Sequence, residues 1–336
     1  TYVMVNIAIP CILWFGGWQV QIGSVSQGQI VALVNYMNQI LLALVALANL
    51  IVAVTRALAC AIRINEVFRV NSSMKEGAEE KNTQESGKPR VVFDHVTFTY
   101  GGAQEASLTD ISFSAMPGET VGIIGGTGSG KSTLVNLIPR FYDATKGSVT
   151  VDGQDVKAYT FRHLREKIGV VPQKAVLFLG TIRSNLQWRK KDAKESELWK
   201  ALQIAQAEEV VKKKQKGLDE KVETGGRNFS GGQRQRLTIA RALVGEPEIL
   251  ILDDSASALD FATDAALRRS IKESTGNATV FLVSQRAATV KNADQILVLD
   301  DGKLVGKGTH EELLKNCNVY KEICMSQFSS QEVAQL

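Results

Sequence analysis

The first 55 residues of the chain contain no charged side chain. From Thr1 to Thr55 there is no Asp, Glu, Lys, Arg or His, whereas the rest of the 336 residues is as charged as an ordinary soluble domain. Two apolar runs, Tyr2 to Ile22 and Ile30 to Val54, flank the polar turn GSVSQGQ. Each run has room for the roughly 20 residues with which a helix crosses a bilayer core. We therefore expect two transmembrane helices, at about residues 2–22 and 30–54; two buried helices of a soluble protein are the alternative.

The distribution of basic residues predicts the orientation of these helices. Arg56, Arg63 and Arg69 follow the second run, whereas the turn between the runs has no basic residue. By the positive-inside rule, the remainder of the chain lies in the cytoplasm. No basic segment precedes the first run and no small-residue cleavage site ends it, so a signal peptide is not indicated. Because the chain opens on Thr, we expect the C-terminal part of a longer integral protein of a bacterial cell membrane.

Four polar side chains of the second run share one side of the predicted helix. Asn35, Asn38, Gln39 and Asn49 fall within a stripe of about 100° at the angular spacing of a helix. Polar groups that face lipid are costly, so this stripe should face other helices or a water-filled cavity. Hydrogen bonds between helices and a surface that lines a substrate path both remain open.

A composition change marks the start of a second domain. Residues 1–70 are predicted to be the C-terminal part of a transmembrane domain with a cytoplasmic extension to residue 70. The segment NSSMKEGAEEKNTQESGKPR, residues 71–90, is polar without an apolar period and is typical of a solvated linker. From residue 91 to about 330, strands such as VVFDHVTFTY alternate with helical patterns. This alternation predicts an α/β domain with a mainly parallel sheet.

Neither the cysteines nor the histidines indicate a metal site. Cys11, Cys60, Cys317 and Cys324, like His95, His163 and His310, have no metal-ligand spacing. In GTHEEL, Thr309 and Glu312 instead predict a capping box for the last helix. A net charge of +4, dispersed along the chain, does not favour a nucleic-acid partner.

The sequence GGTGSGKS at residues 125–132 satisfies the phosphate-loop pattern GxxxxGK(S/T). The strand ETVGII precedes it and the helical stretch STLVNLI follows it, as the motif requires. Backbone N–H groups and the helix N-terminus can hold a polyphosphate, Lys131 can reach the β- and γ-phosphates, and the Ser132 hydroxyl can ligate Mg²⁺. The predicted nucleotide-binding loop comprises Gly125, Gly126, Thr127, Gly128, Ser129, Gly130, Lys131, Ser132 and Thr133.

A carboxylate for the metal ion follows a second buried strand. Asp253 ends the apolar run ILIL, the place at which a magnesium-nucleotide site requires an acid. Upstream, NFSGGQRQR at residues 228–236 is a second glycine turn that leads into the helical stretch TIARALV. One nucleotide does not need two phosphate-binding helix ends in one chain. We infer that the second turn serves a nucleotide held by another chain.

Residues 91 to about 328 resemble the nucleotide-binding domain of an ABC transporter, an α/β P-loop NTPase with a helical subdomain. FSGGQ is similar to the ABC signature, Asp253 to the Walker B aspartate, and SALD at residues 257–260, ending at Asp260, to the D-loop. Tyr100 resembles the aromatic residue that stacks on adenine, and Gln173 the Q-loop glutamine that contacts Mg²⁺. The upstream residues resemble the last two membrane helices of an exporter half-transporter.

The resemblance implies a head-to-tail dimer of two such chains. Each ATP, with Mg²⁺ bound by Ser132, Gln173 and Asp253, would lie between the phosphate loop of one chain and the signature of the other. ATP binding would close the dimer and hydrolysis would reopen it, so that the membrane helices alternate between two states. The signature residues for the partner's nucleotide would be Ser230, Gly231, Gly232 and Gln233.

Two positions depart from the family pattern. The family places a glutamate after the Walker B aspartate as the catalytic base, whereas this chain has Asp254, one methylene shorter; a displacement of about 1 Å can cost on the order of 10²-fold in rate. The family also places a histidine near the γ-phosphate in the switch region, where this chain has Gln285. Glutamine can donate a hydrogen bond but cannot carry a proton near neutral pH.

We therefore predict an ATPase subunit of an exporter, similar to the degenerate-site subunit of heterodimeric multidrug or lipid ABC exporters. It would hydrolyse ATP weakly at its own site and donate its signature to a partner half-transporter. The other expected partners are the lipid bilayer and a small amphipathic substrate, either a drug, a lipid or a peptide. A regulatory ATP-binding subunit, a homodimeric exporter with slow hydrolysis, and a non-transport ABC ATPase remain alternatives.

Overall fold

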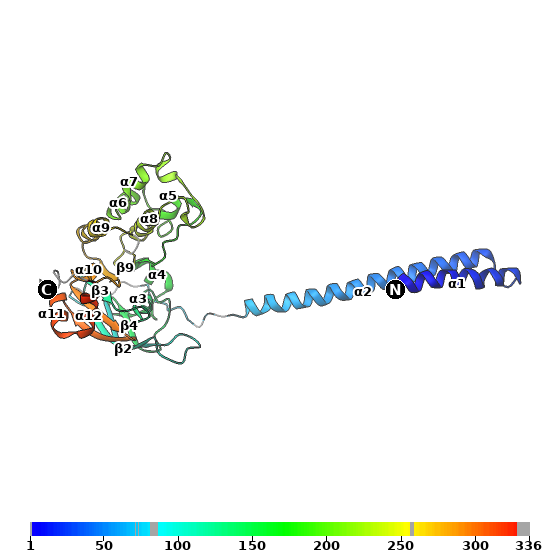
Figure 1. The fold of residues 1–336 in the computed structure, drawn as a ribbon, viewed down its shortest axis with the longest axis horizontal. Helices are drawn as coiled ribbons and strands as arrows, with labels where there is room; N and C mark the ends of the chain where they lie inside the picture. Colours follow the sequence, from blue (N-terminus) through cyan, green and yellow to red (C-terminus); the bar gives the residue numbers. More distant parts are fainter. Residues whose placement is uncertain (1, 71, 73, 81–86, 256–258, 328–336) are drawn as a thin grey trace. The chain divides into compact units, whose positions relative to one another are not determined.

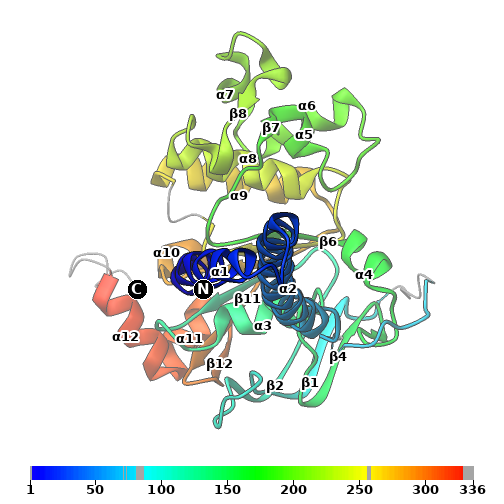
Figure 2. The ribbon, with the colours of Figure 1, turned by 90° about the vertical axis from the view of Figure 1, so that its right-hand side faces the viewer.

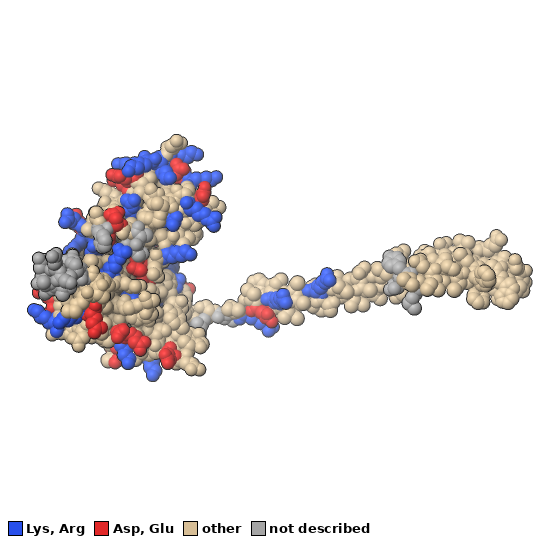
Figure 3. Space-filling model, in the orientation of Figure 1, with Lys and Arg blue, Asp and Glu red and all other residues tan. Residues whose placement is uncertain are grey.

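The computed structural model describes residues 2–70, 72, 74–80, 87–255 and 259–327. The chain divides into two compact units, residues 1–73 and residues 74–336. The first unit contains only helices, and the second contains every strand that the structure describes. Lys, Arg, Asp and Glu side chains are scattered over the visible face of the second unit (Figure 3), whereas the first helix contains none.

The first unit consists of α1, Tyr2–Gln21, and α2, Gln27–Phe68. Helix α2 has 42 residues and is therefore about 63 Å long at 1.5 Å per residue, well beyond the roughly 30 Å of a bilayer core. Among the described residues, α2 is the one helix that is both long and apolar enough to cross a membrane. The expected helix at residues 30–54 and the extension as far as Phe68 thus form one continuous helix, and the expectation of two transmembrane helices is not confirmed.

The second unit is built on a six-stranded sheet with the order β12-β11-β3-β10-β9-β6. Its strands from β11 to β6 are parallel, and β12 pairs antiparallel with β11. This sheet confirms the predicted α/β fold. The strands are β3 (Thr120–Ile124), β6 (Ile168–Val171), β9 (Ile249–Asp253), β10 (Thr279–Val283), β11 (Gln295–Asp300) and β12 (Lys303–Gly308).

A four-stranded antiparallel sheet with the order β2-β1-β4-β5 completes the core, and β7 pairs with β8 in a small separate ribbon. Phe93 and Phe113 stack across β1 and β2 with ring centroids 4.6 Å apart and belong to the cluster that joins the two larger sheets. These strands are β1 (Val91–Phe98), β2 (Leu108–Ala115), β4 (Lys146–Val151), β5 (Gln154–Asp155), β7 (Gly180–Thr181) and β8 (Lys221–Val222).

Two groups stand out among the helices of the second unit (Figure 1). Helices α5 to α8 gather at one end of the unit, while α11 and α12 lie beside β11 and β12 (Figure 2). The helices are α3 (Lys131–Leu137), α4 (Phe161–Lys167), α5 (Ile182–Leu186), α6 (Glu195–Ile204), α7 (Glu208–Lys212), α8 (Gly231–Leu243), α9 (Phe261–Ser274), α10 (Ala287–Val290), α11 (His310–Asn316) and α12 (Asn318–Gln327), with 3₁₀ turns at Gly217–Asp219 and Thr224–Gly226.

Part of the segment that was expected to be a solvated linker is bound to the second unit. Glu79 forms a parallel bridge with Tyr159, and the Gly77 N–H donates to the Tyr159 carbonyl at 3.1 Å. A Cβ atom at Gly77 would lie 2.1 Å from the Ala158 oxygen, so this approach requires glycine. The buried Arg140 donates from Nη2 to the Lys75 carbonyl at 2.7 Å. Residues 75–79 of the expected linker are thus held to the second unit by backbone bonds, while Lys75, Glu76, Ala78 and Glu79 remain exposed to solvent.

Candidate functional site

The loop between β3 and α3 folds around the ammonium group of Lys131. Gly128 and Gly130 have φ angles of 83° and 93°, a left-handed backbone that glycine adopts without strain. The Lys131 Nζ donates to the Gly125 and Gly126 carbonyls at 2.9 and 2.5 Å. Burial lowers the pKa of Lys131, although Asp253 and Asp254 counteract this shift. A buried ammonium group whose charged form is disfavoured is suited to an anionic ligand.

Packing against a neighbouring strand fixes the first glycine of this loop. A Cβ atom at Gly125 would lie 2.1 Å from the Leu299 carbonyl and 2.6 Å from Ser129 Oγ. Since the Leu299 carbonyl belongs to β11, a side chain at residue 125 would push the loop away from the sheet. Gly125, Gly126 and Ser129 thus shape the loop and bind the ammonium group, but they do not line the adjoining cavity.

Parallel pairing brings Asp253 to the same edge of the sheet as this loop. Val283 of β10 is in register with Ile123 of β3 and with Asp253 of β9. The Ser132 hydroxyl donates to Asp253 Oδ1 at 3.0 Å. Burial, together with the charge of Asp254, raises the pKa of Asp253 above its ordinary value, and the bond from Ser132 opposes this rise. A nearby cation would stabilise the ionised carboxylate.

The oxygen atoms of Ser132 and Asp253 fit a magnesium ion. Mg²⁺ prefers oxygen ligands and is usually held by one or two protein groups together with water and substrate phosphates. Within the described part of the chain, no group of three His, Cys, Asp or Glu residues could hold a metal by itself. The hydroxyl and carboxylate therefore suit an ion that arrives with a polyphosphate.

Asp254 points its carboxylate toward Gln173, which follows β6. The Gln173 Nε2 donates to Asp254 Oδ2 at 3.3 Å. The Asp254 backbone has a φ angle of 45°, and its N–H donates to the Val283 carbonyl at 3.0 Å. This left-handed conformation is one that aspartate tolerates better than most residues with a side chain. The backbone thus holds Asp254 beside β10.

A cavity of about 400 Å³ joins these groups. The predicted residues that line it are Tyr100, Thr127, Gly128, Gly130, Lys131, Ser132, Thr133, Gln173, Asp253, Asp254 and Gln285. The remaining residues of its lining, which the sequence analysis missed, are Ala106, Ser107, Val283, Asp301 and Gly302. Asp301 and Gly302 form the turn between β11 and β12, and this Asp-Gly pair is a hairpin signal in the sequence. No local pattern shows that the turn borders the cavity.

Tyr100 supplies an aromatic wall to the cavity. Its hydroxyl lies 3.1 Å from the Thr133 hydroxyl, on the first turn of α3. Its ring meets Phe98 and Tyr142 edge-on, with centroid distances of 4.7 and 5.1 Å. Neighbours on two sides hold the ring in place beside a cavity that also contains Lys131. An aromatic ring and a buried cation in one cavity suit a ligand that combines a planar base with phosphates.

The second glycine turn does not reach this cavity. Ser230, Gly231, Gly232 and Gln233 begin α8, and none of them lines the cavity. The Ser230 hydroxyl accepts from the Gln233 N–H at 3.3 Å, and the Gln233 side chain accepts from the Ser230 N–H at 3.1 Å. Ser230 and Gly231 are exposed. This capping box closes the helix end locally and leaves the turn open to solvent.

Asp260 likewise begins a helix outside the cavity. Its carboxylate accepts from the Thr263 N–H and hydroxyl, each at 2.8 Å, and these bonds lower the pKa of Asp260. Residues 256–258, which include Ser257 and Ala258 of the predicted D-loop, lie outside the described residues. The structure therefore places Asp260 as the N-cap of α9.

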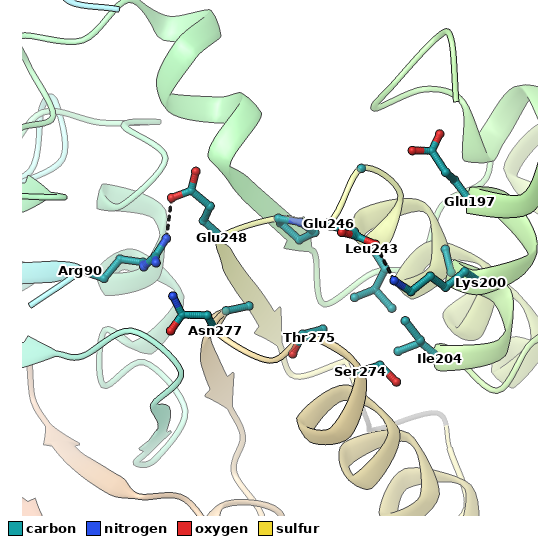
Figure 4. Close-up of a pocket in the computed structure, with 14 residues that line it drawn as sticks. Arg90, Glu197, Lys200, Ile204, Leu243, Glu246, Glu248, Ser274, Thr275 and Asn277 are labelled. Carbon is teal, nitrogen blue, oxygen red and sulfur yellow. Dashed lines mark hydrogen bonds and ion pairs between the residues drawn. The ribbon is translucent and has the colours of Figure 1, made fainter. Parts of the chain in front are cut away.

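A second cavity, of about 360 Å³, lies where α6 meets the start of β9 (Figure 4). Inside it, Lys200 pairs with Glu246 at 2.6 Å and Arg90 pairs with Glu248 at 2.5 Å. None of the predicted site residues lines this cavity. Its buried cation, Arg90, is thus already paired with a carboxylate, and no aromatic residue is among those that line the cavity.

Comparisons with known proteins agree with this geometry. Residues 108–257 match the family model described as ABC transporter. An uncharacterized ABC transporter ATP-binding protein of Mycobacterium tuberculosis is 42% identical over 336 residues, which are 99% of this chain and 57% of the relative. A probable multidrug resistance ABC transporter ATP-binding/permease protein of Bacillus subtilis is 39% identical over 318 residues, 92% of this chain and 46% of the relative.

A solved structure resembles the whole chain. The structure of a bacterial Atm1-family ABC exporter with ATP bound has a TM-score of 0.79 and 29% sequence identity, and the match covers 98% of this chain and 58% of that chain. This chain spans 46–57% of the length of the two relatives above. The similarity thus extends over both units of this chain and over part of each relative.

Proposed function

Because the chain contains the ATP-binding domain of an ABC transporter joined to a membrane part of the exporter type, we propose that it is a subunit of an ATP-driven exporter that donates its signature to a partner. The observation that carries this proposal is the position of Ser230–Gln233. The turn is exposed, capped by its own side chains and outside the cavity that contains Lys131. Its glycines and helix N-terminus can serve a phosphate only if another chain brings one.

The cavity of this chain binds Mg-ATP. Lys131 and the first turn of α3 would hold the phosphates, and Tyr100 would stack on the base. Ser132 and Asp253 would hold the magnesium ion, which neutralises phosphate charge. Binding would relieve both unfavourable ionisations, since phosphate favours the charged form of Lys131 and a cation favours the charged form of Asp253.

Hydrolysis at this chain's own site would be slow. Asp254 stands at the position of the catalytic base, but its carboxylate is one methylene shorter than glutamate and accepts a hydrogen bond from Gln173. A short and occupied carboxylate is badly placed to take a proton from water. Gln285, in the switch region, has no proton to exchange near neutral pH. The site would therefore hold ATP for long periods, while the partner's site hydrolyses it.

The first unit requires an apolar environment outside this chain. No residue of α2 is buried in the structure, and Leu42, Ile51 and Ile62 are 59–66% exposed. Exposed apolar side chains along a helix of this length are stable in a bilayer or against other helices, and the polar stripe would face such helices. We propose that both α1 and α2 cross the membrane, with the ATP-binding domain in the cytoplasm. The transported substrate would be a small amphipathic drug, lipid or peptide.

The main competing proposal is a regulatory subunit that binds ATP and gates a transporter without hydrolysis by either chain. The same Asp254 and Gln285 would suit this role. A homodimer with two slow sites would also carry two copies of each residue. Both alternatives predict the absence of a fast site in the assembled complex, and this distinguishes them from the exporter with one catalytic partner.

Steady-state ATP turnover tests the proposal. The protein would be purified alone and together with a co-expressed ABC half-transporter that has glutamate and histidine at the positions of Asp254 and Gln285. We expect little turnover from the protein alone, ordinary turnover from the pair, and loss of the pair's turnover in Ser230→Ala. Ordinary turnover by the protein alone would contradict the proposal. A slow pair would favour regulation or a slow homodimer.

A further inference from the structure

The carboxamide of Gln327 binds the backbone on both sides of Arg286. Its Nε2 donates to the Gln285 carbonyl at 2.7 Å, and its Oε1 accepts from the Ala287 N–H at 2.8 Å. One side chain thus satisfies an acceptor and a donor of the short segment between β10 and α10. Loss of this side chain would leave both backbone groups to water.

This segment carries the switch glutamine into the nucleotide cavity. On its N-terminal side, the Ser284 N–H donates to the Ile123 carbonyl at 3.0 Å, which continues the pairing of β10 with β3. The chain then leaves the sheet at Gln285, which lines the cavity together with Lys131 and Asp253. The Gln285 carbonyl, which lies beyond the end of β10, is thus held by the side chain of Gln327 from α12.

The helix that presents Gln327 is itself firmly packed. Tyr320 and Cys324 are 0% and 1% exposed, and together with Gln327 they follow the i, i+4, i+7 spacing of one helix face. The Tyr320 hydroxyl lies 2.7 Å from His310 Nδ1 in α11. Tyr320 and Cys324 thus anchor α12 up to one turn before Gln327, whose own side chain bonds the switch segment.

We propose that Gln327 is a positioning residue for Gln285, through which the last turn of α12 sets how tightly the site holds the terminal phosphate of ATP. This inference rests on the proposed nucleotide function of the cavity. Gln285 lines the same cavity as Lys131, Asp253 and Asp254, so its amide is available to the phosphate at that position. Gln327 does not line the cavity, and it acts by fixing the backbone from which Gln285 projects.

A double-mutant cycle with two nucleotides tests this role. Affinities of Mg-ATP and Mg-ADP would be measured by calorimetry on the full chain in detergent for Gln327→Ala, Gln285→Ala and the double variant. Loss of one positioned hydrogen bond should weaken Mg-ATP about three- to tenfold. Mg-ADP, which lacks the terminal phosphate, should bind as before. In the Gln285→Ala background, Gln327→Ala should have no further effect.

Two more variants separate positioning from folding. Gln327→Glu keeps an acceptor for the Ala287 N–H but cannot donate to the Gln285 carbonyl, so it should weaken Mg-ATP as Gln327→Ala does. Gln203→Ala removes an exposed glutamine of α6 and should change neither affinity. The thermal midpoint of each variant without nucleotide reports on folding.

The outcomes distinguish this inference from the function on which it rests. Equal losses of Mg-ATP and Mg-ADP, or an undiminished effect of Gln327→Ala in the Gln285→Ala background, would overturn the positioning role alone. Unchanged Mg-ATP affinity in Gln327→Ala would do the same. Failure of the unmodified protein to bind Mg-ATP would overturn the nucleotide function and the positioning role together.

Discussion

The chain contains two glycine turns that each begin a helix, and they differ in what surrounds them. The phosphate loop before α3 is enclosed by β11 and contains the buried Lys131. The signature turn before α8 is exposed and closed by a capping box between Ser230 and Gln233. Both helix ends can bind an anion. The first has the groups of a complete site around it, whereas the second has only a helix end.

Tertiary position, rather than local chemistry, makes this difference. Parallel pairing of β3, β10 and β9 delivers Asp253 to the end of α3, because the carboxyl ends of parallel strands share one edge. The signature turn begins α8, which lies with α5, α6 and α7 at one end of the unit (Figure 1), and none of Ser230–Gln233 lines the cavity. This difference is what the proposed function requires, with one turn serving a nucleotide within the chain and the other serving a partner's nucleotide.

The largest effect should come from the phosphate loop. Lys131→Ala removes a buried ammonium group, and charge-assisted bonds contribute about 1.5–3 kcal/mol each. We expect at least about 10²-fold weaker Mg-ATP binding in calorimetry. Lys200→Ala, which alters the pocket in Figure 4, should bind normally. A loss of less than threefold in Lys131→Ala would show that the loop does not hold the phosphates.

A longer carboxylate at residue 254 should raise the turnover of the protein alone. Asp254→Glu restores the reach of the family's base, and a shift of about 1 Å can change a rate 10²-fold. We expect an increase of about tenfold, because Gln285 remains unchanged. Phosphate release would be measured, with Asp254→Asn as a control that stays slow. If Asp254→Glu hydrolysed ATP no faster than the parent protein, the short carboxylate would not be the cause of slow hydrolysis.

A smaller effect should follow from the signature turn. Ser230→Ala removes the N-cap of α8 and should lower the free energy of unfolding by about 1 kcal/mol, while this chain's own Mg-ATP affinity stays the same. Thr309→Ala removes the corresponding cap of α11 and should have a similar cost. Denaturant unfolding and calorimetry provide the two values. If Ser230→Ala weakened binding of the chain's own ATP and Thr309→Ala did not, the signature would have to be part of the chain's own nucleotide site.

The smallest expected effect is the pH dependence of stability, which should have opposite signs for Asp253 and Asp260. Burial raises the pKa of Asp253 from 3.8, so its contribution to stability without nucleotide is present below 3.8 and is lost as pH rises through the raised value. Hydrogen bonds from Thr263 lower the pKa of Asp260 from 3.8, so its contribution is present above 3.8 and is lost as pH falls through the lowered value.

The stability of Asp253→Asn relative to the parent protein should therefore increase as pH rises through the raised pKa of Asp253. The stability of Asp260→Asn relative to the parent should increase as pH falls below 3.8, because only the parent loses a stabilising charge. Thermal midpoints without Mg²⁺ and nucleotide would show shifts of about 1–3 °C. The same sign for both variants would mean that burial does not govern Asp253.

Many residues of the cavity could be predicted from the sequence because they follow apolar strands. Lys131, Asp253 and Gln285 each follow an apolar strand, and the structure brings them to one cavity because β3, β9 and β10 are neighbours. The capping box of Thr309 and Glu312 is confirmed, because it depends on residues three apart, but it begins α11 and not the last helix, since α12 follows. The alternating strand and helix patterns predict the α/β class, and the six-stranded sheet confirms it.

The features that the sequence did not reveal depend on tertiary contacts. The turn at Asp301 reaches the cavity only through the antiparallel return of β12. Gln327 ends a helix near the C-terminus, and no local pattern connects it with Gln285. The extension of α2 to Phe68 was separated from the apolar run because charged residues begin at Arg56, although no Gly or Pro breaks the helix there.

The bound segment at residues 75–79 has a consequence for how the domain should be dissected. Three backbone hydrogen bonds join Gly77 and Glu79 to Ala158, Tyr159 and Thr160. During synthesis this segment leaves the ribosome about 80 residues before its binding surface, so that edge can close only after Thr160 has emerged. A fragment that begins at Val91 would lack these bonds and leave Arg140 facing water in place of the Lys75 carbonyl. A fragment that begins at Met74, the first residue of the second unit, would retain this edge.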